Sequence, residues 1–174
     1  AAYCEEALAL FREAGEPGRE AHALYELGNN LMRLGDWERA RGALDEAERL
    51  FAHLGLTRRL AMTYWAQGVS HLMLGDDARC EEALARAVAA SRAEGYGVPV
   101  AARDALARLG VLYQKQGRYD EAASHLAEAL EIAERYQQRH YRAIYRFRLA
   151  EALRLGGRID DARAAYYQAL AEVE

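Results

Sequence analysis

The sequence predicts an all-α fold made of stacked helical repeats, and two observations support this. A similar segment recurs four times in the 174 residues, with its first small residue at intervals of 40, 42 and 40 residues. A fixed period of this size is typical of stacked repeat proteins. The positions that recur are separated by sums of three and four residues, the spacing of one helix face, and no alternating β-branched run predicts a strand. The first small residues of the four copies are Gly28, Gly68, Gly110 and Ala150.

Each copy contains two helices that meet at a second glycine, seven residues after the first small residue. A glycine can end a helix in the left-handed conformation. Asp36 and Asp76 follow it as N-caps in the first two copies. Arg118 and Arg158 replace them in the last two, so we expect those turns to be less well capped. The second glycines are Gly35, Gly75, Gly117 and Gly157.

The first small residue lies inside the apolar pattern, where a glycine costs about 1 kcal/mol relative to alanine. We interpret it as a close approach of the two helices of one copy rather than as a helix break. The small residues twelve and nineteen positions later, such as Ala40 and Ala47, are expected on the other side of that contact. A large residue follows at sixteen positions in every copy, namely Leu44, Leu84, Leu126 and Tyr166.

In chain order, the first predicted helix is a lone second helix, because Ala7, Leu10 and Phe11 match Ala47, Leu50 and Phe51. The connections carry Pro17 and Pro99, which can each begin a helix. The nine predicted helices are 3–14, 19–34, 37–53, 58–74, 77–94, 99–116, 119–136, 140–155 and 159–173. We predict one array over 1–174, with a partial repeat at 1–18 and full repeats at 19–57, 58–97, 98–138 and 139–174.

The glycine and alanine columns resemble those of the tetratricopeptide repeat (TPR) family over almost the whole chain. The resemblance implies a right-handed superhelix, an α-solenoid of about nine antiparallel helices. Arg146 departs from the column that is usually aromatic or large and apolar. Repeats of this length resemble those of kinesin light chains, Gα-binding spindle-orientation adaptors, bacterial Rap-type regulators and the tails of STAND-class ATPases. Of the 23 basic residues only Lys115 is a lysine, which favours a GC-rich bacterial source.

Composition and motifs argue against several other classes of function. The net charge of −4 gives little support to nucleic-acid binding. The chain has no glycine-rich phosphate loop, no zinc-spaced His/Cys cluster and no apolar run near the roughly 20 residues of a membrane span. We therefore predict no enzyme, catalytic residue, metal or cofactor, and no membrane partner. Cys80 fills a small-residue column, so a packed thiol in the reducing cytoplasm is expected. The chain starts without methionine and part-way through a repeat, so we expect a piece of a longer protein whose exposed ends pair in solution.

By the same resemblance, the first helices line a concave groove that binds a peptide or helix. The exposed groove positions include an apolar centre at Trp65, Val69 and Met73, which pack on neighbouring helices if the groove is empty. The groove has five basic and three acidic residues, which favours an acidic or amphipathic partner. The expected peptide-binding residues are Tyr25, Asn29, Arg33, Trp65, Val69, Met73, Arg108, Val111, Lys115, Arg148 and Glu151, and Ile144 and Phe147 share the fourth set.

Two functions follow from this reading. The leading hypothesis is a non-enzymatic protein-interaction module, the sensor or scaffold part of a larger bacterial signalling protein. The alternative is a structural spacer or oligomerisation array with no ligand in the groove.

Overall fold

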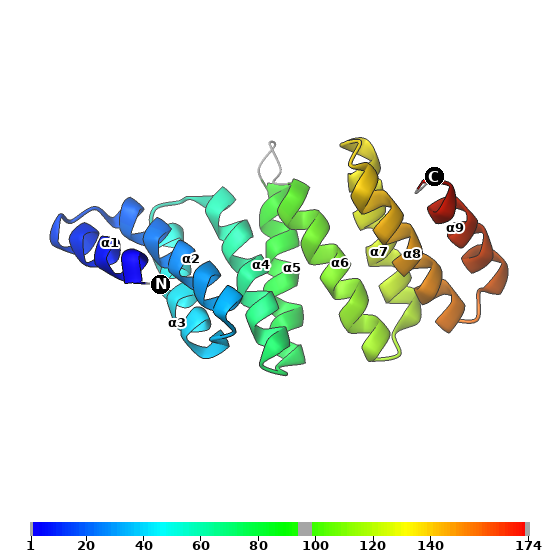
Figure 1. Ribbon diagram of the computed structural model, residues 1–174, viewed down its shortest axis with the longest axis horizontal. Coiled ribbons are helices and arrows are strands. Elements are labelled where there is room, and N and C mark those ends of the chain that lie inside the picture. Colours follow the sequence, from blue (N-terminus) through cyan, green and yellow to red (C-terminus); the bar gives the residue numbers. More distant parts are fainter. Residues whose placement is uncertain (1, 94–98, 173–174) are drawn as a thin grey trace. The chain divides into compact units, whose positions relative to one another are not determined.

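The computed structural model describes residues 2–93 and 99–172. Over these residues it has nine α-helices and no strand, which confirms the all-α prediction (Figure 1). Every predicted helix is present, with its ends within three residues of the expected positions. The helices are α1 (Ala2–Glu13), α2 (Pro17–Leu34), α3 (Trp37–His53), α4 (Thr57–Met73), α5 (Asp77–Ala93), α6 (Pro99–Lys115), α7 (Tyr119–Arg135), α8 (Arg139–Leu155) and α9 (Ile159–Ala171).

The chain divides into two compact units, Ala1–Ala101 and Ala102–Glu174. The N-terminal unit contains α1 to α5 and the first residues of α6. The C-terminal unit contains the rest of α6 and α7 to α9. In both, consecutive helices whose connections are described are joined by short turns and run in opposite directions (Figure 1).

The turns inside the repeats have the geometry that the second glycine predicts. Each of these four glycines adopts a left-handed backbone conformation, with φ between 74° and 80°. The carboxylates of Asp36 and Asp76 accept hydrogen bonds from the backbone N–H groups of Arg39 and Arg79, at 3.4 and 3.1 Å. Arg118, the N-cap residue of α7, makes no side-chain capping bond to the backbone of that helix, so the weaker capping expected in the third repeat is found.

The turns between repeats also contain a residue in the left-handed region, and the two units differ in the type of that residue. Gly15 and Gly55 of the N-terminal unit have φ values of 65° and 66°. Gln137 stands at the corresponding point between α7 and α8, with φ of 52°. A residue with a Cβ atom is strained there, because the left-handed conformation brings Cβ close to the backbone.

The first glycines mark a close helix approach, as predicted. A Cβ atom added at Gly28, Gly68 or Gly110 would lie 2.7, 2.6 or 2.5 Å from a side-chain atom. That atom belongs to the leucine sixteen positions later: Leu44, Leu84 or Leu126. The expectation that small residues form the other side of the contact is met in part, because the residue twelve positions later lies at the glycine in the first two repeats, but the leucine side chain is nearer. The carbonyl oxygen of Ala40 lies behind it, at 3.4 Å from a Cβ at Gly28.

The core of the N-terminal unit is continuous from α1 to α4. Its buried side chains include Leu24, Leu44 and Phe51, and Ala66 of α4 joins them. Leu60, Met62 and Trp65 of α4 are partly buried against the same cluster. Helix α4 therefore covers a face formed by α2 and α3.

The C-terminal unit buries a charged residue in a column that holds alanine elsewhere. Arg103 is 2% exposed, whereas its equivalents Ala21 and Ala61 are fully buried. Its guanidinium stacks on the ring of Tyr141, 3.6 Å from the centroid, and donates to Asp104 and Gln138. Tyr145 also donates to the Asp104 carboxylate, at 3.1 Å. The arginine is tolerated in the column because every polar neighbour in this network has a partner.

Candidate peptide-binding site

In the N-terminal unit, the structure corrects part of the predicted groove. Tyr25 was expected on the exposed side but is 6% exposed, and Ala66, next to the expected groove residue Trp65, is fully buried. Both belong to the core cluster, because α4 packs over α2 and α3. Asn29 is half-buried and Arg33 is exposed, so these two remain accessible to a ligand.

Trp65, the expected apolar anchor, is half-buried against the core of α1 to α3. Its indole Nε1 is buried and has no hydrogen-bond partner among the described residues. Val69 is half-buried, and Met73 is 55% exposed. Packing on neighbouring helices, which the sequence left open for Trp65, is therefore observed, and the accessible apolar side chain of this set is Met73.

In the C-terminal unit, three further predicted residues lie on α6. Arg108 and Lys115 are exposed, and Val111 is half-buried. Within residues 2–93 and 99–172, neither cation forms an ion pair. They give this helix positive charge that is not neutralised within the described part of the chain.

The predicted residues of the fourth repeat come together at a pocket of about 720 Å³ between α8 and α9. Ile144, Phe147, Arg148 and Glu151 of α8 form one side, as the sequence analysis expected for the groove. Gln114 of α6, an expected groove position of the third repeat, also lines the pocket. The remaining lining residues were missed by sequence reasoning, namely Ala143, Tyr166, Ala169 and Leu170.

A paired exchange in two columns accounts for the aromatic wall of this pocket. The first three repeats have a glycine covered by a leucine, whereas the fourth has Ala150 and Tyr166. In the first three repeats a Cβ atom at the glycine position would lie less than 3 Å from the leucine, so an alanine there fits only if the leucine shifts or is replaced. The ring of Tyr166 instead packs edge-to-face on Phe147, with centroids 5.5 Å apart. The replacement of Gly and Leu by Ala150 and Tyr166 is visible in the sequence, and it could have been used to predict an aromatic residue at this position of α9.

The polar side of the pocket is neutralised internally. The hydroxyl of Tyr166 donates to the Glu151 carboxylate, and so does the guanidinium of Arg154. The hydrogen bonds from Arg154 and then from Tyr166 lower the pKa of Glu151 to about 2. The bond to Glu151 also raises the pKa of Tyr166. Glu151 therefore orients the Tyr166 ring and adds little net negative charge to the site.

Arg148 leaves a positive charge at the rim of the pocket. Its side chain is exposed, and no acidic partner for it is found in the described parts of the chain. The Gln114 side chain donates to the backbone carbonyl of Arg148 at 3.4 Å, which links α6 to α8. The pocket thus combines apolar walls with one cation that is available to a ligand.

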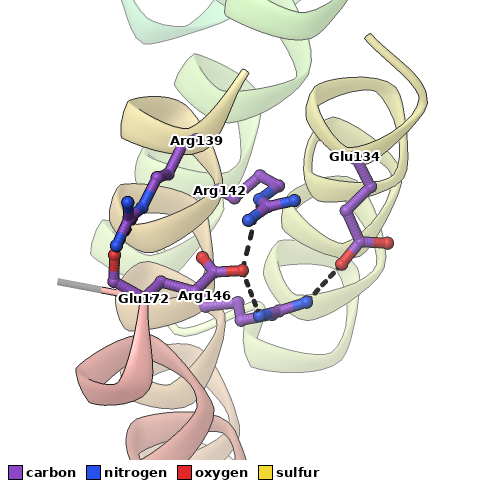
Figure 2. A network of polar contacts seen from close by, with 5 residues as sticks. All are labelled: Glu134, Arg139, Arg142, Arg146 and Glu172. Carbon is purple, nitrogen blue, oxygen red and sulfur yellow. Dashed lines mark hydrogen bonds and ion pairs between the residues drawn. The ribbon is translucent and has the colours of Figure 1, made fainter. Parts of the chain in front are cut away.

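A group of arginines fixes the end of α9, which carries one wall of the pocket (Figure 2). The Glu172 carboxylate faces Arg142, with Oε1 3.2 Å from Nε, and also pairs with Arg146. Arg146 bridges to Glu134 of α7, and Arg139 donates to the Glu172 carbonyl at 3.0 Å. Arg146, the departure from the family column, therefore replaces apolar packing by ion pairs that tie α7, α8 and α9 together.

Over the described ranges, no group of three or more His, Cys, Asp or Glu residues is placed to hold a metal ion. Of the helices in these ranges, none is both long enough and apolar enough to span a membrane.

Comparison with known proteins agrees with a stacked helical-repeat class. Two tetratricopeptide repeat models match residues 102–171 and 21–53, together more than half of the chain. The chain belongs to the tetratricopeptide repeat family, whose members are in general non-enzymatic scaffolds for protein interaction. A search of curated protein sequences finds no match.

Solved structures share the fold at low sequence identity. BtubC (BKLC) from P. vanneervenii is 19% identical with a TM-score of 0.84, covering 97% of this chain and 72% of its own. Kinesin light chain TPR-like repeats from Podosopora anserina are 19% identical with a TM-score of 0.77, covering 97% and 82%. Aspartyl phosphate phosphatase F from Bacillus subtilis is 15% identical with a TM-score of 0.84, covering 98% of this chain but 44% of its own.

Proposed function

We propose that the chain binds a peptide or helix of a protein partner and serves as the sensor or scaffold part of a larger bacterial regulatory protein in the cytoplasm. The observation that carries this proposal is the meeting of Ile144, Phe147, Arg148 and Glu151 at one pocket. These residues were selected by their place in the repeat, and they line a volume within the roughly 300–1,000 Å³ of ligand sites.

The chemistry of the pocket defines the ligand. Phe147 is 57% exposed and Leu170 is 59% exposed, so an apolar side chain that enters between them removes both from water. Arg148 then lies where a carboxylate of the ligand gains a charge-assisted hydrogen bond. An amphipathic, acidic segment meets both requirements.

The N-terminal unit contributes to the same function in a different way. Asn29 provides an amide that can bind the backbone of an extended peptide, and Arg33 and Met73 supply charge and accessible apolar surface. These residues form a polar and adaptable surface, because methionine fits ligands of different shape.

A peptide array followed by titration tests the proposal. For a peptide that binds, Phe147→Ala is expected to raise Kd by about 30-fold, since a buried aromatic anchor contributes about 2 kcal/mol. Arg148→Glu should weaken binding more at low salt than at high salt, because exposed charges are screened. Arg163→Glu is the matched control, as Arg163 is 71% exposed and does not line the pocket.

The alternative function, a spacer or oligomerisation array with an empty groove, predicts other results. Phe147→Ala and Arg148→Glu would then leave every partner affinity unchanged. Trp65→Ala needs a stability measurement beside it, because Trp65 packs on the core and its loss acts on folding as well as on binding.

A further inference from the structure

We propose that Arg103 of α6 is a positioning residue for the pocket of the C-terminal unit, although it does not line that pocket. Through Asp104 and through side chains of α8, it holds α8 where Ile144 and Arg148 line the pocket. This inference uses the pocket of the proposed function, but it concerns the geometry of the C-terminal unit and requires no protein partner.

The column of Arg103 does not favour an arginine. The equivalent residues of the other three repeats are Ala21, Ala61 and Ala143, and the first two of these are fully buried. Arg103 is buried as well, with 2% of its surface exposed. A buried guanidinium is costly unless ion pairs and hydrogen bonds satisfy it. The conformation of the C-terminal unit therefore depends on whether the partners of Arg103 stay in place.

These partners come from α6 itself and from one side of α8 and its N-cap. Gln138, Tyr141 and Tyr145 are separated by three and four residues, so they share that side. The Gln138 side chain accepts a hydrogen bond from Arg103, and the Tyr141 ring centroid lies 3.6 Å from the guanidinium carbon. Asp104 Oδ1 accepts from Arg103 Nε at 2.9 Å and from the Tyr145 hydroxyl at 3.1 Å. Because a guanidinium carries its donors in fixed, planar directions, these contacts fix where α8 lies against α6.

The pocket residues lie on the same segment of α8. Ile144 precedes Tyr145, and Arg148 follows about one turn later. Gln114, which lines the pocket from α6, donates to the Arg148 carbonyl at 3.4 Å. Gln114 comes eleven residues after Arg103, about three helical turns, so both lie on the side of α6 that contacts α8. The Gln114 bond is long and exposed, so the buried Arg103 network is the stronger restraint on α8.

The matching columns of the N-terminal unit contain small side chains instead. Ala21 and Thr63 stand there in place of Arg103 and Tyr145, and both are fully buried. The Thr63 hydroxyl donates within its own helix, to the Arg59 carbonyl at 2.9 Å. The polar restraint on α8 is therefore a property of the third and fourth repeats and not of the repeat pattern.

The isoleucines provide a direct test, because the sequence contains only three. Ile132, Ile144 and Ile159 lie on α7, α8 and α9, so a methyl NMR spectrum of isoleucine-labelled protein has one signal from the pocket. Arg103→Met keeps a long side chain and removes its hydrogen bonds. Its two polar partners, Asp104 and Gln138, are half-buried and keep access to water.

This variant separates position from stability. Replacement of a buried ionic group by an apolar one of similar size is often neutral for stability. We therefore expect Arg103→Met to keep the circular dichroism and the urea midpoint of the unmodified chain. Its Ile144 methyl signal should move, whereas the signal of Ile159, which is 58% exposed on α9, should stay in place.

Two further variants on α6 grade the effect. Asp104→Asn keeps the shape of the side chain, which is 28% exposed, and removes its charge. It should move the Ile144 signal in the same direction as Arg103→Met and by a smaller amount. Arg108→Met is the matched control, because Arg108 is exposed on the same helix and does not line the pocket. It should leave the Ile144 signal unchanged.

Binding is measured with 2-naphthoate, which combines aromatic rings with a carboxylate and so matches the apolar wall and Arg148. Its Kd, followed at the Ile144 signal, should rise about fivefold in Arg103→Met, since residues that do not touch a ligand commonly change its binding by such factors.

Three results would overturn the proposal. The first is an Ile144 signal that stays in place in both Arg103→Met and Asp104→Asn. The second is an equal movement of that signal in Arg108→Met, and the third is an unchanged Kd for 2-naphthoate beside a moved signal. If the signal and the Kd change as expected but no peptide binds any form of the chain, this inference stands and the proposed function fails.

Discussion

The first and fourth repeats have the same backbone plan but differ in whether a neighbouring helix covers the same side of the repeat. In the first, Gly28 is covered by Leu44, and α4 closes the face above them. In the fourth, Ala150 and Tyr166 replace this pair, and the corresponding face lines an accessible pocket. A change in two columns thus accompanies the replacement of a covered face by an accessible pocket, without any change in helix order.

The comparison also explains the distribution of charge. The acids on α3 that bind Gln67 have apolar equivalents on α9, and Glu26 on α2 has Arg148 as its equivalent on α8. Polar groups that bind a neighbouring helix in the first repeat are therefore absent where a ligand is expected. The following predictions test which of these differences matter, from the largest expected effect to the smallest.

Gly68→Leu tests the repeats in which a leucine covers the first glycine. A Cβ atom there would lie 2.6 Å from a methyl carbon of Leu84, so the two helices must separate. We expect a loss of about 3 kcal/mol or more in the free energy of unfolding in urea, as overpacking commonly costs 1–3 kcal/mol. Gly42→Leu is the control, because a Cβ at Gly42 has no atom within 4 Å. Gly97, a sequence-based choice of control in a connection, lies outside the described residues. Equal losses in both variants would contradict the helix contact.

A double-mutant cycle tests the fourth repeat, in which Ala150 and Tyr166 replace the glycine and the leucine. Tyr166→Leu alone places a leucine against the Cβ of Ala150 and should lower the free energy of unfolding by about 1–3 kcal/mol. Adding Ala150→Gly recreates the pair of the first repeat and should recover most of that loss. A coupling energy near zero would show that the two columns vary independently.

His71→Leu tests one column within the N-terminal unit. The first repeat has the buried Leu31 where the second has His71, which is 9% exposed with its Nδ1 buried and unpartnered among the described residues. Since a buried unsatisfied polar group costs about 1–3 kcal/mol, the leucine variant should unfold at higher urea concentration. A leucine variant with a lower midpoint would mean that the histidine makes a favourable contact.

The same variant should change the pH dependence of stability. Burial lowers the pKa of His71, so the folded protein binds this proton less tightly than the unfolded chain does. The free energy of unfolding is therefore highest when His71 is neutral, at pH 8. It decreases as the pH falls through about 6.5, the pKa of the histidine in the unfolded chain. Urea titrations at pH 8 and pH 5.5 should differ more for the unmodified protein than for His71→Leu.

Gln137→Gly tests the difference between the turns of the two units. Gly15 and Gly55 adopt the left-handed conformation without strain, whereas Gln137 carries a Cβ. Relief of this strain should exceed the entropy cost of glycine and raise stability by about 0.5–1 kcal/mol. Gly55→Gln should lower it by a similar amount. Thermal melts that move in the same direction for both variants would contradict the argument.

The helices and turns were predictable because the same sequence pattern recurs in each repeat. The second glycines and the sums of three and four residues place all nine helices, and Asp36 and Asp76 identify the better capped turns. The contact of Gly28 with the helix that carries Ala40 was predictable, but the nearer partner, Leu44, was not. The sequence shows which columns are small but not which side chain lies across them.

The site was only partly predictable. Ile144, Phe147, Arg148 and Glu151 follow from their repeat positions. The burial of Tyr25 and Trp65 does not, because it depends on how closely α4 approaches α2 and α3. Arg103 stands in an alanine column, and its burial requires Tyr141 and Gln138, which come more than 30 residues later in the chain.

The exchange of Gly–Leu for Ala–Tyr restricts the order in which an ancestral repeat could have acquired it. Alanine introduced first meets the leucine at a distance below 3 Å, as the three Gly–Leu pairs indicate. Tyrosine introduced first meets only a glycine, and its ring is free to turn toward the residue at position 147. Of the two orders of substitution, tyrosine before alanine is therefore the one that avoids this close contact.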